Sequence, residues 1–577
     1  MVKCEWLWSG YARPQPEVSG LRTFTLTVLG TTDLHGNLFN WDYYLDREFD
    51  DFAHNDVGLA KVSTLVNEVR AAVGRHRTLL LDAGDTIQGT PLAYYYAKVE
   101  PITRTHVHPM AAAMNAIGYT AAALGNHEFN YGLDVLRTFE RQLEFPLLAA
   151  NALDVTTGQP AFPPYVIHTV WRTDGPPLRV GILGLTNPGI AVWDRAHVEG
   201  VLTFPGLVEQ ALHWVPEVRS KSDLVIVAAH SGADLSSSLG DQVPFPENCA
   251  ELLAETVPGI DAVLVGHAHV EIPERFVTNK VTGRPVLLTE PLYWGKRLSL
   301  MEFDLRFSQR WELVASRSSV LTSASVEEDP RIVRLLRHDH EKVVSYVNAH
   351  IGTCSAAMSA ARSRFEDTPA LRFINHVQAL ELAKSTSLPV VSLCAPFNRA
   401  AAIPSGEVSI RDVAGLYIFD NTLVGVRLTG AQLRDFLEES ARYFVSVDGP
   451  GPFSADEVSA DVPDYNFDIA YGLSAPLTYD IDISQPVGSR IVGLAYGGVP
   501  VADSFEFAVA VNNYRQAGGG DFPHIASAPV LHNQQQEIRQ LLIDWVKAAG
   551  VLNPADFAGS DWRLVADGTP VVISTNG

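Results

Sequence analysis

Short apolar runs alternate with helical patterns over the first half of the chain, from about residue 22 to residue 326. Apolar side chains at helical spacing predict helices over Leu59–Val73 and Gly132–Leu143. Several of the remaining apolar runs are rich in Val, Leu or Thr and end just before a residue type that binds metals. These runs are Thr23–Thr32, Thr78–Ala83, Thr120–Leu124, Leu224–Ala229 and Ala262–Val265. The alternation predicts an α/β domain.

Two later apolar runs, Val286–Thr289 and Leu298–Leu305, follow each other without a helix between them. This order predicts antiparallel strands that close the sheet, with residues 290–294 as the loop between them.

The pattern changes at residues 328–351, where Asp329 and Pro330 mark a helix start and apolar residues recur at roughly helical spacing. We expect a linker helix here, between a first domain at 22–327 and a second at 352–555. In the second domain the pattern predicts further helices and strands. They are Ala370–Ser385 and Gly430–Tyr443 for the helices, and Leu388–Cys394, Thr422–Leu428 and Phe505–Val511 for the strands. Residues 556–577 have weak periodicity, which predicts an irregular C-terminal extension.

Seven side chains of metal-binding type stand just past the carboxyl ends of the five runs in the first domain. They are Asp33, His35, Asp85, Asn126, His230, His267 and His269. In an open α/β sheet these strand ends share one crevice, so residues distant in sequence converge there. Taken singly, Asp-x-His or Gly-Asp is a common turn; the joint occurrence of all five motifs makes the site.

Seven ligands are more than one ion takes, whereas two ions that share a bridging carboxylate use all of them. Asp85, alone on a Gly-Asp turn, is the predicted bridge. Two cations about 3.5–4 Å apart stabilise the entering and leaving oxygens of an in-line displacement at phosphorus. His127 follows the amide ligand Asn126 directly and is free to act on whatever the ions hold. The predicted chemistry is phosphoester hydrolysis.

Length and charge restrict the class of protein and of partner. With 577 residues the chain exceeds what one core usually holds, and 46% hydrophobic against 19% charged residues describes a globular protein. The formal net charge of −23 argues against a nucleic-acid polymer as partner. A phosphate site in this chain must be made locally positive by metal ions or arginine.

The cysteines and the N-terminal residues bear on compartment. Cys4, Cys249, Cys354 and Cys394 match no zinc or redox spacing, so unpaired structural thiols are expected. The first twenty residues lack the apolar region of a secretory signal, and no apolar run reaches the length of a membrane span. As written, the chain is expected to be cytoplasmic; an incomplete or processed N-terminus would fit an exported protein equally well.

The second domain offers candidate substrate ligands. Arg399 follows a predicted strand and has the bidentate geometry that suits a phosphate. Tyr465, Phe467 and Tyr514 are candidates for stacking on a flat base, which contributes about 1–3 kcal/mol per base. Each of these residues also has a structural alternative, as a surface arginine or as core aromatics.

The motifs resemble those of a known family. Asp33-x-His35, Gly84-Asp85, Gly125-Asn-His-Glu128, His230 and Gly266-His-Ala-His269 are similar to the five blocks of the calcineurin-like metallophosphoesterases. The linker and second domain resemble the two-domain 5′-nucleotidase family through three further motifs. These are Pro396-Phe-Asn-Arg399, Leu428-Thr-Gly430, and Asn513-Tyr-Arg515 before Gly518-Gly-Gly520.

Three segments resemble one branch of that family, the 2′,3′-cyclic-nucleotide 2′-phosphodiesterase/3′-nucleotidases. They are Gly125–Gly132, Val192–Gly200 and Asn512–Arg515. The resemblance implies a four-layer β-sandwich flanked by helices in the first domain and an α/β substrate-binding domain after the linker helix. It also implies two divalent ions, Mn, Zn, Co or Mg, and rotation of the second domain about the linker helix. Cyclic nucleotides would be opened to 3′-nucleotides and then hydrolysed to nucleosides.

The sequence departs from the family pattern at Asn130. Linear 5′-nucleotidases typically carry aspartate there, forming a dyad with the histidine; an amide orients His127 but cannot stabilise its cation by charge. The resemblance maps a base-stacking pair onto Tyr514 and either Tyr465 or Phe467. His269 stands where some members have an amide. Its imidazole favours Zn²⁺, Mn²⁺ or Co²⁺ over Mg²⁺.

Two other functions are compatible with the scaffold. One is a linear 5′-nucleotidase or UDP-sugar hydrolase; the other is a non-catalytic nucleotide sensor. Loss of a metal ligand would favour the sensor, yet all seven ligands and His127 are present. Base preference, native metal and oligomeric state are left open by the sequence.

Overall fold

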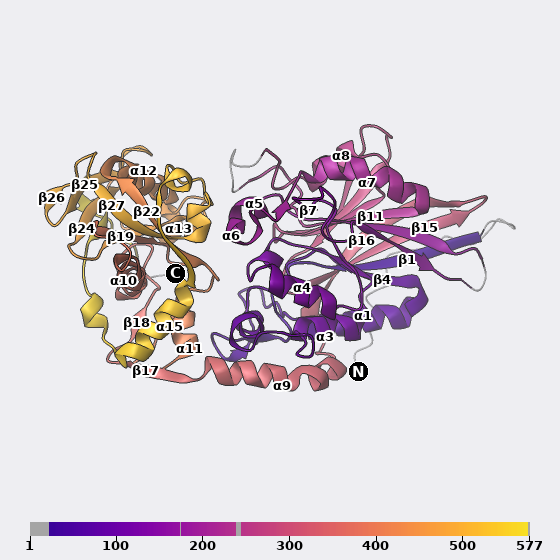
Figure 1. Cartoon of the computed structure of the whole chain (residues 1–577), viewed down its shortest axis with the longest axis horizontal. Helices are drawn as coiled ribbons and strands as arrows, with labels where there is room; N and C mark the ends of the chain where they lie inside the picture. Colours follow the sequence, from indigo (N-terminus) through magenta and orange to yellow (C-terminus); the bar gives the residue numbers. More distant parts are fainter. Residues whose placement is uncertain (1–21, 173–174, 238–243, 575–577) are drawn as a thin grey trace.

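Two six-stranded sheets packed face to face form the N-terminal domain of the computed structural model, which describes residues 22–172, 175–237 and 244–574 (Figure 1). The first sheet has the order β16-β15-β1-β4-β5-β6 and the second β13-β14-β12-β11-β9-β8. The first consists of β16 (Trp311–Thr322), β15 (Arg297–Phe307), β1 (Arg22–Thr31), β4 (Thr78–Asp82), β5 (Ala121–Ala123) and β6 (Leu147–Leu148). The second consists of β13 (Glu271–Thr278), β14 (Pro285–Pro291), β12 (Ala262–Val265), β11 (Leu224–Ala229), β9 (Leu178–Leu185) and β8 (Tyr165–Val170).

Apolar side chains on both faces of the sheets explain why these strands read as continuous hydrophobic runs. In β1, Leu26 and Val28 pack into the core between the two sheets, while Leu29 packs on the opposite face. Helices α1 (Leu59–Val73), α3 (Pro109–Ile117) and α4 (Leu133–Gln142) cover the outer face of the first sheet. Helices α7 (Leu207–Lys221) and α8 (Ala250–Thr256) cover the second. The domain is therefore the four-layer sandwich that the resemblance implies.

The strands that carry the predicted ligands run in the same direction. In the first sheet β1, β4 and β5 are parallel neighbours, and in the second β11 and β12 are. Their carboxyl ends consequently lie at one edge of the sandwich.

The prediction for Val286–Thr289 and Leu298–Leu305 is wrong in one respect, because the two strands belong to different sheets. The first lies in β14, which pairs in parallel with β12, and the second lies in β15, which pairs antiparallel to β1. The loop between them crosses from one sheet to the other, with Leu292 and Trp294 in left-handed backbone conformation. A pattern of apolar positions does not reveal which sheet a strand joins.

Helix α9 (Pro330–Val347) connects the two domains and runs along the base of the N-terminal domain (Figure 1). The Asp329 side chain caps it by accepting from the backbone N–H of Arg331, and also accepts from the Ser63 hydroxyl of α1. Ile332 and Leu336 are buried against the first domain. The helix expected within 328–351 is thus confirmed, and its apolar stripe fixes it to the first domain.

A five-stranded sheet with the order β23-β19-β27-β22-β28 forms the centre of the C-terminal domain. Its strands are β23 (Ile469–Gly472), β19 (Val390–Cys394), β27 (Glu506–Asn512), β22 (Thr422–Thr429) and β28 (Val530–Glu537). Helices α10 (Pro369–Ala383), α12 (Gly430–Ser440) and α15 (Ile538–Ala549) pack on it. A three-stranded sheet, β21 (Gly406–Ser409), β17 (His350–Cys354) and β29 (Val551–Leu552), receives the chain from α9. The predicted helices and strands of this domain are all present.

The prediction of an irregular C-terminal extension is wrong for the described part of residues 556–577. There β30 (Trp562–Ala566) pairs in parallel with β24 (Leu477–Asp482), within a second five-stranded sheet. Trp562 is only 1% exposed. A strand of five residues is too short to show periodicity, and its partner lies far away in sequence.

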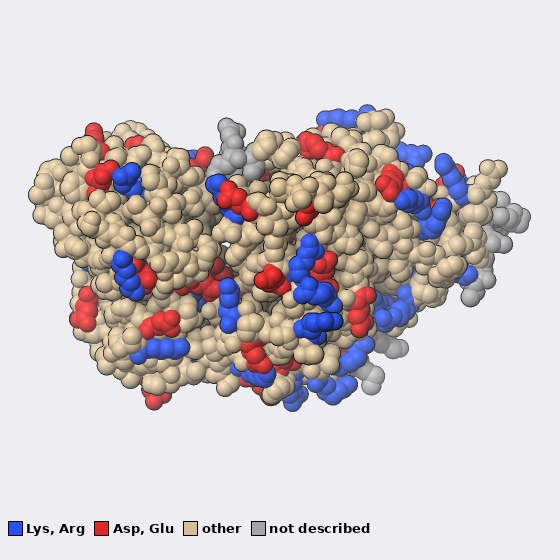
Figure 2. Space-filling model, in the orientation of Figure 1, with Lys and Arg blue, Asp and Glu red and all other residues tan. Residues whose placement is uncertain are grey.

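The described residues also answer two smaller expectations. Cys249, Cys354 and Cys394 are buried free thiols, and Cys4 lies outside the described residues. Every helix in the described ranges is too short or too polar to cross a bilayer. Acidic and basic side chains are interspersed over both domains on the face shown in Figure 2.

Candidate metal centre and interdomain cleft

All seven predicted ligands converge at the carboxyl ends of β1, β4, β5, β11 and β12. Their ligand atoms fall into two groups, each within 4.8 Å: Asp33, His35 and His269 in one, and Asp85, His230 and His267 in the other. The amide oxygen of Asn126 lies 3.0 Å from His230 Nε2, so it adjoins the second group.

Asp85 lies between the two groups. Its Oδ2 is 3.0 Å from His230 Nε2 and 3.9 Å from His35 Nε2. One carboxylate within reach of both groups has the placement that a bridging ligand needs.

The backbone at the ligands is strained. Asp33, His35, Asp85, His267 and His269 all have positive φ, between 48° and 78°. Few residues other than glycine adopt this region, and such strain collects at functional sites.

Two glycines allow the loops after β4 and β5 to touch. A Cβ on Gly125 would lie 2.1 Å from Asp85 Oδ1, and one on Gly84 would lie 2.3 Å from the backbone nitrogen of Gly125. Only hydrogen fits at either position. The glycines of the Gly-Asp and Gly-Asn-His-Glu motifs therefore bring Asp85 and Asn126 together.

Hydrogen bonds outside the two groups fix which ring nitrogen each histidine offers. His35 Nδ1 lies 2.9 Å from the carbonyl oxygen of Gln88, and His230 Nδ1 lies 2.8 Å from that of Ala83. Because a carbonyl only accepts, each Nδ1 carries the proton and Nε2 is left to bind metal. His267 uses its Nε2 for Glu247, 2.9 Å away, which leaves Nδ1 as its ligand atom.

The charges of the site also suit bound cations. Burial raises the pKa of Asp33 and Asp85, but neighbouring histidines, chiefly His269 and His230, lower both by more, so both carboxyls are ionised. Burial lowers the pKa of His230, while Asp85 raises it to about 10. Asp33 Oδ1 is buried without a hydrogen-bond partner among the described residues. Ionised oxygens and oriented imidazoles are a donor set for divalent metal ions.

Glu128 and Glu247 are site residues to which the sequence gave no role. Glu128 is buried and accepts from the backbone N–H groups of Asp85 and Gly125, so it ties the two ligand loops together. Its place in the Gly-Asn-His-Glu motif was the available signal. Glu247 does not follow the end of a predicted strand and belongs to no motif, so no signal in the sequence pointed to it.

His127 stands beside the metal ligands without belonging to either group. Its backbone N–H donates to Asp85 Oδ1, and its Nδ1 lies 2.6 Å from Asn130 Oδ1. The side chain is 37% exposed, and its Nε2 is 4.0 Å from Asp85 Oδ2. The ring is therefore available to a substrate bound next to the ligands.

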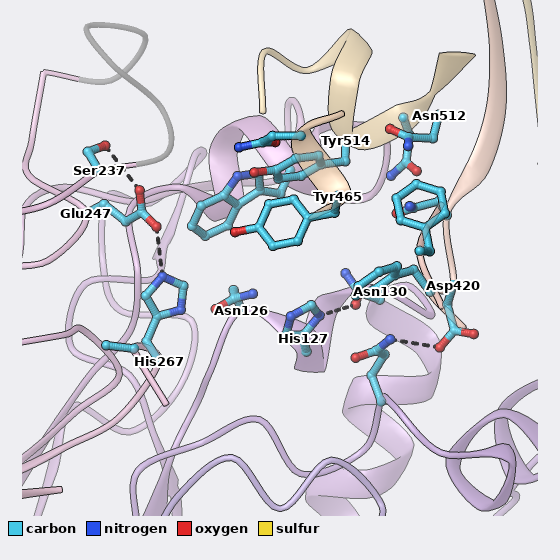
Figure 3. Close-up of a pocket in the computed structure, with 18 of the residues that line it drawn as sticks. Asn126, His127, Asn130, Ser237, Glu247, His267, Asp420, Tyr465, Asn512 and Tyr514 are labelled. Atoms are coloured by element: carbon cyan, nitrogen blue, oxygen red, sulfur yellow. Dashed lines mark hydrogen bonds and ion pairs between the residues drawn. The ribbon is translucent and has the colours of Figure 1, made fainter. Parts of the chain in front are cut away.

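A cavity of about 570 Å³ separates the ligands from the C-terminal domain. Asn126, His127 and His267 line it from one side, and Tyr465 and Tyr514 from the other (Figure 3). The two tyrosine rings stand edge to face, with centroids 6.4 Å apart and planes at 86°. Tyr465 is 39% exposed.

Two predicted substrate ligands do not reach the cavity. Phe467 is fully buried and stacks on Tyr443 at 4.9 Å, so it belongs to the core; of the two candidates, Tyr465 lines the cavity. Arg399 Nε lies 2.9 Å from Asp464 Oδ2, and Arg399 is not among the residues lining the cavity. Packing accounts for Phe467, whereas Arg399 is half exposed and pairs with the residue before Tyr465.

The domains also meet through Asp420 at the edge of the cavity. Its Oδ2 accepts from Gln88 Nε2 at 2.8 Å and from the Tyr131 hydroxyl at 2.7 Å, both in the N-terminal domain. Its Oδ1 pairs with Arg539 of its own domain at 2.7 Å.

Comparison with known proteins identifies both halves. Residues 26–271 match the family described as calcineurin-like phosphoesterase, and residues 349–527 match the 5′-nucleotidase, C-terminal domain. The 2′,3′-cyclic-nucleotide 2′-phosphodiesterase/3′-nucleotidase of Salmonella typhimurium is 33% identical over 602 residues, covering 94% of this chain and 89% of the relative. The chain belongs to the 5′-nucleotidase family. Its C-terminal family match begins at residue 349, just after α9 ends at Val347.

Other members of the 5′-nucleotidase family match over nearly the whole chain. The trifunctional nucleotide phosphoesterase protein YfkN of Bacillus subtilis is 33% identical over 583 residues, which is 93% of this chain. The chain spans only 39% of the length of that relative. The crystal structure of a 5′-nucleotidase precursor from Thermus thermophilus covers 94% of the chain with a TM-score of 0.62 at 24% identity, which supports the fold.

Proposed function

We propose that this chain hydrolyses 2′,3′-cyclic nucleotides to 3′-nucleotides and then to nucleosides. The observation that carries the proposal is the cavity that has His127 and the metal ligands on one side and two tyrosines on the other. Relatives named for this activity are 32–33% identical over 94% of the chain, which supports the choice of substrate.

Two groups of residues would hold the metal ions: Asp33, His35 and His269, and Asp85, Asn126, His230 and His267. Two divalent ions, when bound, polarise a phosphate and make water a nucleophile near neutral pH. With four imidazoles in the donor set, Mn²⁺, Zn²⁺ and Co²⁺ suit the site better than Mg²⁺.

His127 is the proposed catalytic acid. Asn130 Oδ1 accepts a hydrogen bond from His127 Nδ1. The other ring nitrogen, Nε2, then lies 4.0 Å from Asp85 Oδ2, beside the candidate metal ligands. In its protonated form, Nε2 donates a proton to the ribose oxygen that leaves phosphorus. The same nitrogen then recovers a proton before the second hydrolysis.

Tyr465 and Tyr514 are the proposed base-binding residues. Because their rings stand edge to face, a base stacks on the face of one ring and meets the edge of the other. Aromatic faces bind any base, so this contact favours nucleotides over simple phosphate esters without selecting one base.

Product analysis tests the proposal directly. Metal-stripped protein is reloaded with Mn²⁺, incubated with 2′,3′-cyclic AMP and sampled over time by chromatography. The proposal predicts 3′-AMP first and adenosine later, with EDTA stopping both steps. Formation of 2′-AMP, or bound metal without any product, would contradict it.

A further inference from the structure

Asp194 is a buried carboxylate that forms no ion pair with any of the described residues. It lies between α5 (Ile190–Trp193) and α6 (Arg195–Val198). Figure 1 shows these two helices on the side of the first domain that faces the second. Its Oδ1 accepts from Asn130 Nδ2 at 2.7 Å, and its Oδ2 has no hydrogen-bond partner among the described residues. The residue is 4% exposed. Burying an unpaired carboxylate costs stability.

The usual structural role of an aspartate at this place is absent. Asp194 occupies the position before the first turn of α6, where an aspartate side chain commonly caps the helix. Here the side chain makes no capping bond. Burial raises the pKa of Asp194 to about 7, against the opposing effects of the Asn130 hydrogen bond and His127. The side chain thus accepts its hydrogen bond from Asn130 and not from the backbone of α6.

The bond to Asp194 determines how the Asn130 amide is oriented. Above the pKa of Asp194 its carboxylate only accepts hydrogen bonds, so Nδ2 of Asn130 faces Asp194 and Oδ1 faces His127. Because an amide oxygen also only accepts, His127 Nδ1 must carry the proton. The neutral ring then leaves Nε2 without a proton.

We propose that Asp194 is a positioning residue, which through Asn130 holds His127 in the Nδ1–H tautomer with Nε2 directed to the substrate. Asp194 acts on His127 through Asn130, whereas a carboxylate at position 130 would contact His127 directly. Without it the amide can turn over and present its NH₂ group to Nδ1, which demands the opposite tautomer. The role of Asp194 in catalysis rests on the proposed hydrolytic activity.

Kinetics of Asp194→Asn test this role with 2′,3′-cyclic AMP and Mn²⁺-loaded protein. We expect kcat to fall roughly 10- to 100-fold, KM to stay within about twofold, and bound metal to be unchanged. In a His127→Ala background the same change has no further effect on kcat, because Asp194 acts through His127. The matched control is Glu199→Gln in the same segment, an exposed carboxylate paired with Arg195, which leaves kcat unchanged.

The thermal midpoint separates this role from a structural one. Asp194→Asn keeps the shape of the side chain and removes a buried charge, so the midpoint at pH 8 stays equal or rises. A lowered midpoint, an unchanged kcat, or an equal loss of kcat in the His127→Ala background would each overturn the proposal.

Histidine NMR gives a readout that does not depend on turnover. In ¹⁵N-histidine-labelled, Zn²⁺-loaded protein, the signal of His127 is assigned by its loss in His127→Ala. We expect the Nδ1–H tautomer in the wild type and a mixture in Asp194→Ala. The Nε2–H tautomer in the wild type, or no change in Asp194→Ala, would overturn the positioning role. If the wild type hydrolyses no nucleotide, the proposed function fails. The NMR measurement still shows whether Asp194 determines the tautomer of His127.

Discussion

At the residue scale, His127 separates catalysis from metal binding. Its ring belongs to neither ligand group, and Asn130 holds its Nδ1 at 2.6 Å. His127→Ala should lower kcat roughly 10²- to 10⁴-fold, the usual contribution of a general acid, and leave the metal content unchanged. Steady-state kinetics with elemental analysis of the same sample check both parts. A kcat within about twofold of wild type would remove His127 from the mechanism.

Tyr514 tests the base-binding side of the cavity. Tyr514→Ala should raise KM for 2′,3′-cyclic AMP roughly 5- to 150-fold, because stacking on a base contributes about 1–3 kcal/mol. The matched control is a substrate without any aromatic ring, glycerol 1,2-cyclic phosphate, whose hydrolysis should be unchanged. An equal loss with both substrates would show that Tyr514 supports the metal site and does not bind the base.

At the element scale, the contact between the loops after β4 and β5 depends on Gly125. In Gly125→Ala the new methyl would meet both Oδ1 and the backbone nitrogen of Asp85, at 2.1 and 2.4 Å. The loops must then separate, so metal affinity should fall steeply while the four-layer core still folds. Calorimetric titration with Mn²⁺ and circular dichroism check the two parts. Gly158→Ala serves as control, because its positive φ of 66° strains the backbone but nothing lies within 4 Å of the added Cβ.

The charges of the candidate ligands predict how metal affinity depends on pH. Without metal, Asp85 raises the pKa of His230 to about 10, while the carboxyls of Asp33 and Asp85 have lowered pKa values. The imidazole must release its proton to bind metal, whereas the carboxylates are already ionised. Affinity should therefore strengthen as pH rises from 6 to 9, with proton release on binding. Calorimetry in buffers of different ionisation enthalpy measures this, and a pH-independent affinity would refute it.

The convergence of the candidate ligands could be predicted from the sequence because each one is a local feature. Asp33, Asp85 and His230 come within three residues of the ends of buried strands, and parallel strands place such residues at one edge. Features that depend on pairing between distant segments were not predictable. β14 and β15 enter different sheets, β30 joins β24, and Phe467 packs on Tyr443, yet no local pattern distinguishes these outcomes. Asp194 was likewise hidden, because its link to Asn130 spans 64 residues.

At the scale of the whole molecule, Asp420 joins the domains across the cavity. Gln88→Ala combined with Tyr131→Phe removes both hydrogen bonds from the first domain and leaves the Asp420–Arg539 pair intact. If the domains turn about α9, the double variant should favour a more open arrangement and a larger radius of gyration by X-ray scattering. Tyr165→Phe, which loses a hydroxyl contact to Glu217 within the first domain, is the control. Identical scattering curves would contradict a role for Asp420 in closure.

The central claim is that the metal groups of the first domain and the tyrosines of the second act together on 2′,3′-cyclic nucleotides. The most direct test compares kcat/KM of Mn²⁺-loaded protein for 2′,3′-cyclic AMP, 3′-AMP, 5′-AMP and UDP-glucose. Faster turnover of the first two substrates is the predicted result. A preference for 5′-AMP or UDP-glucose would keep the metal site and the fold, but would contradict the cyclic-nucleotide assignment.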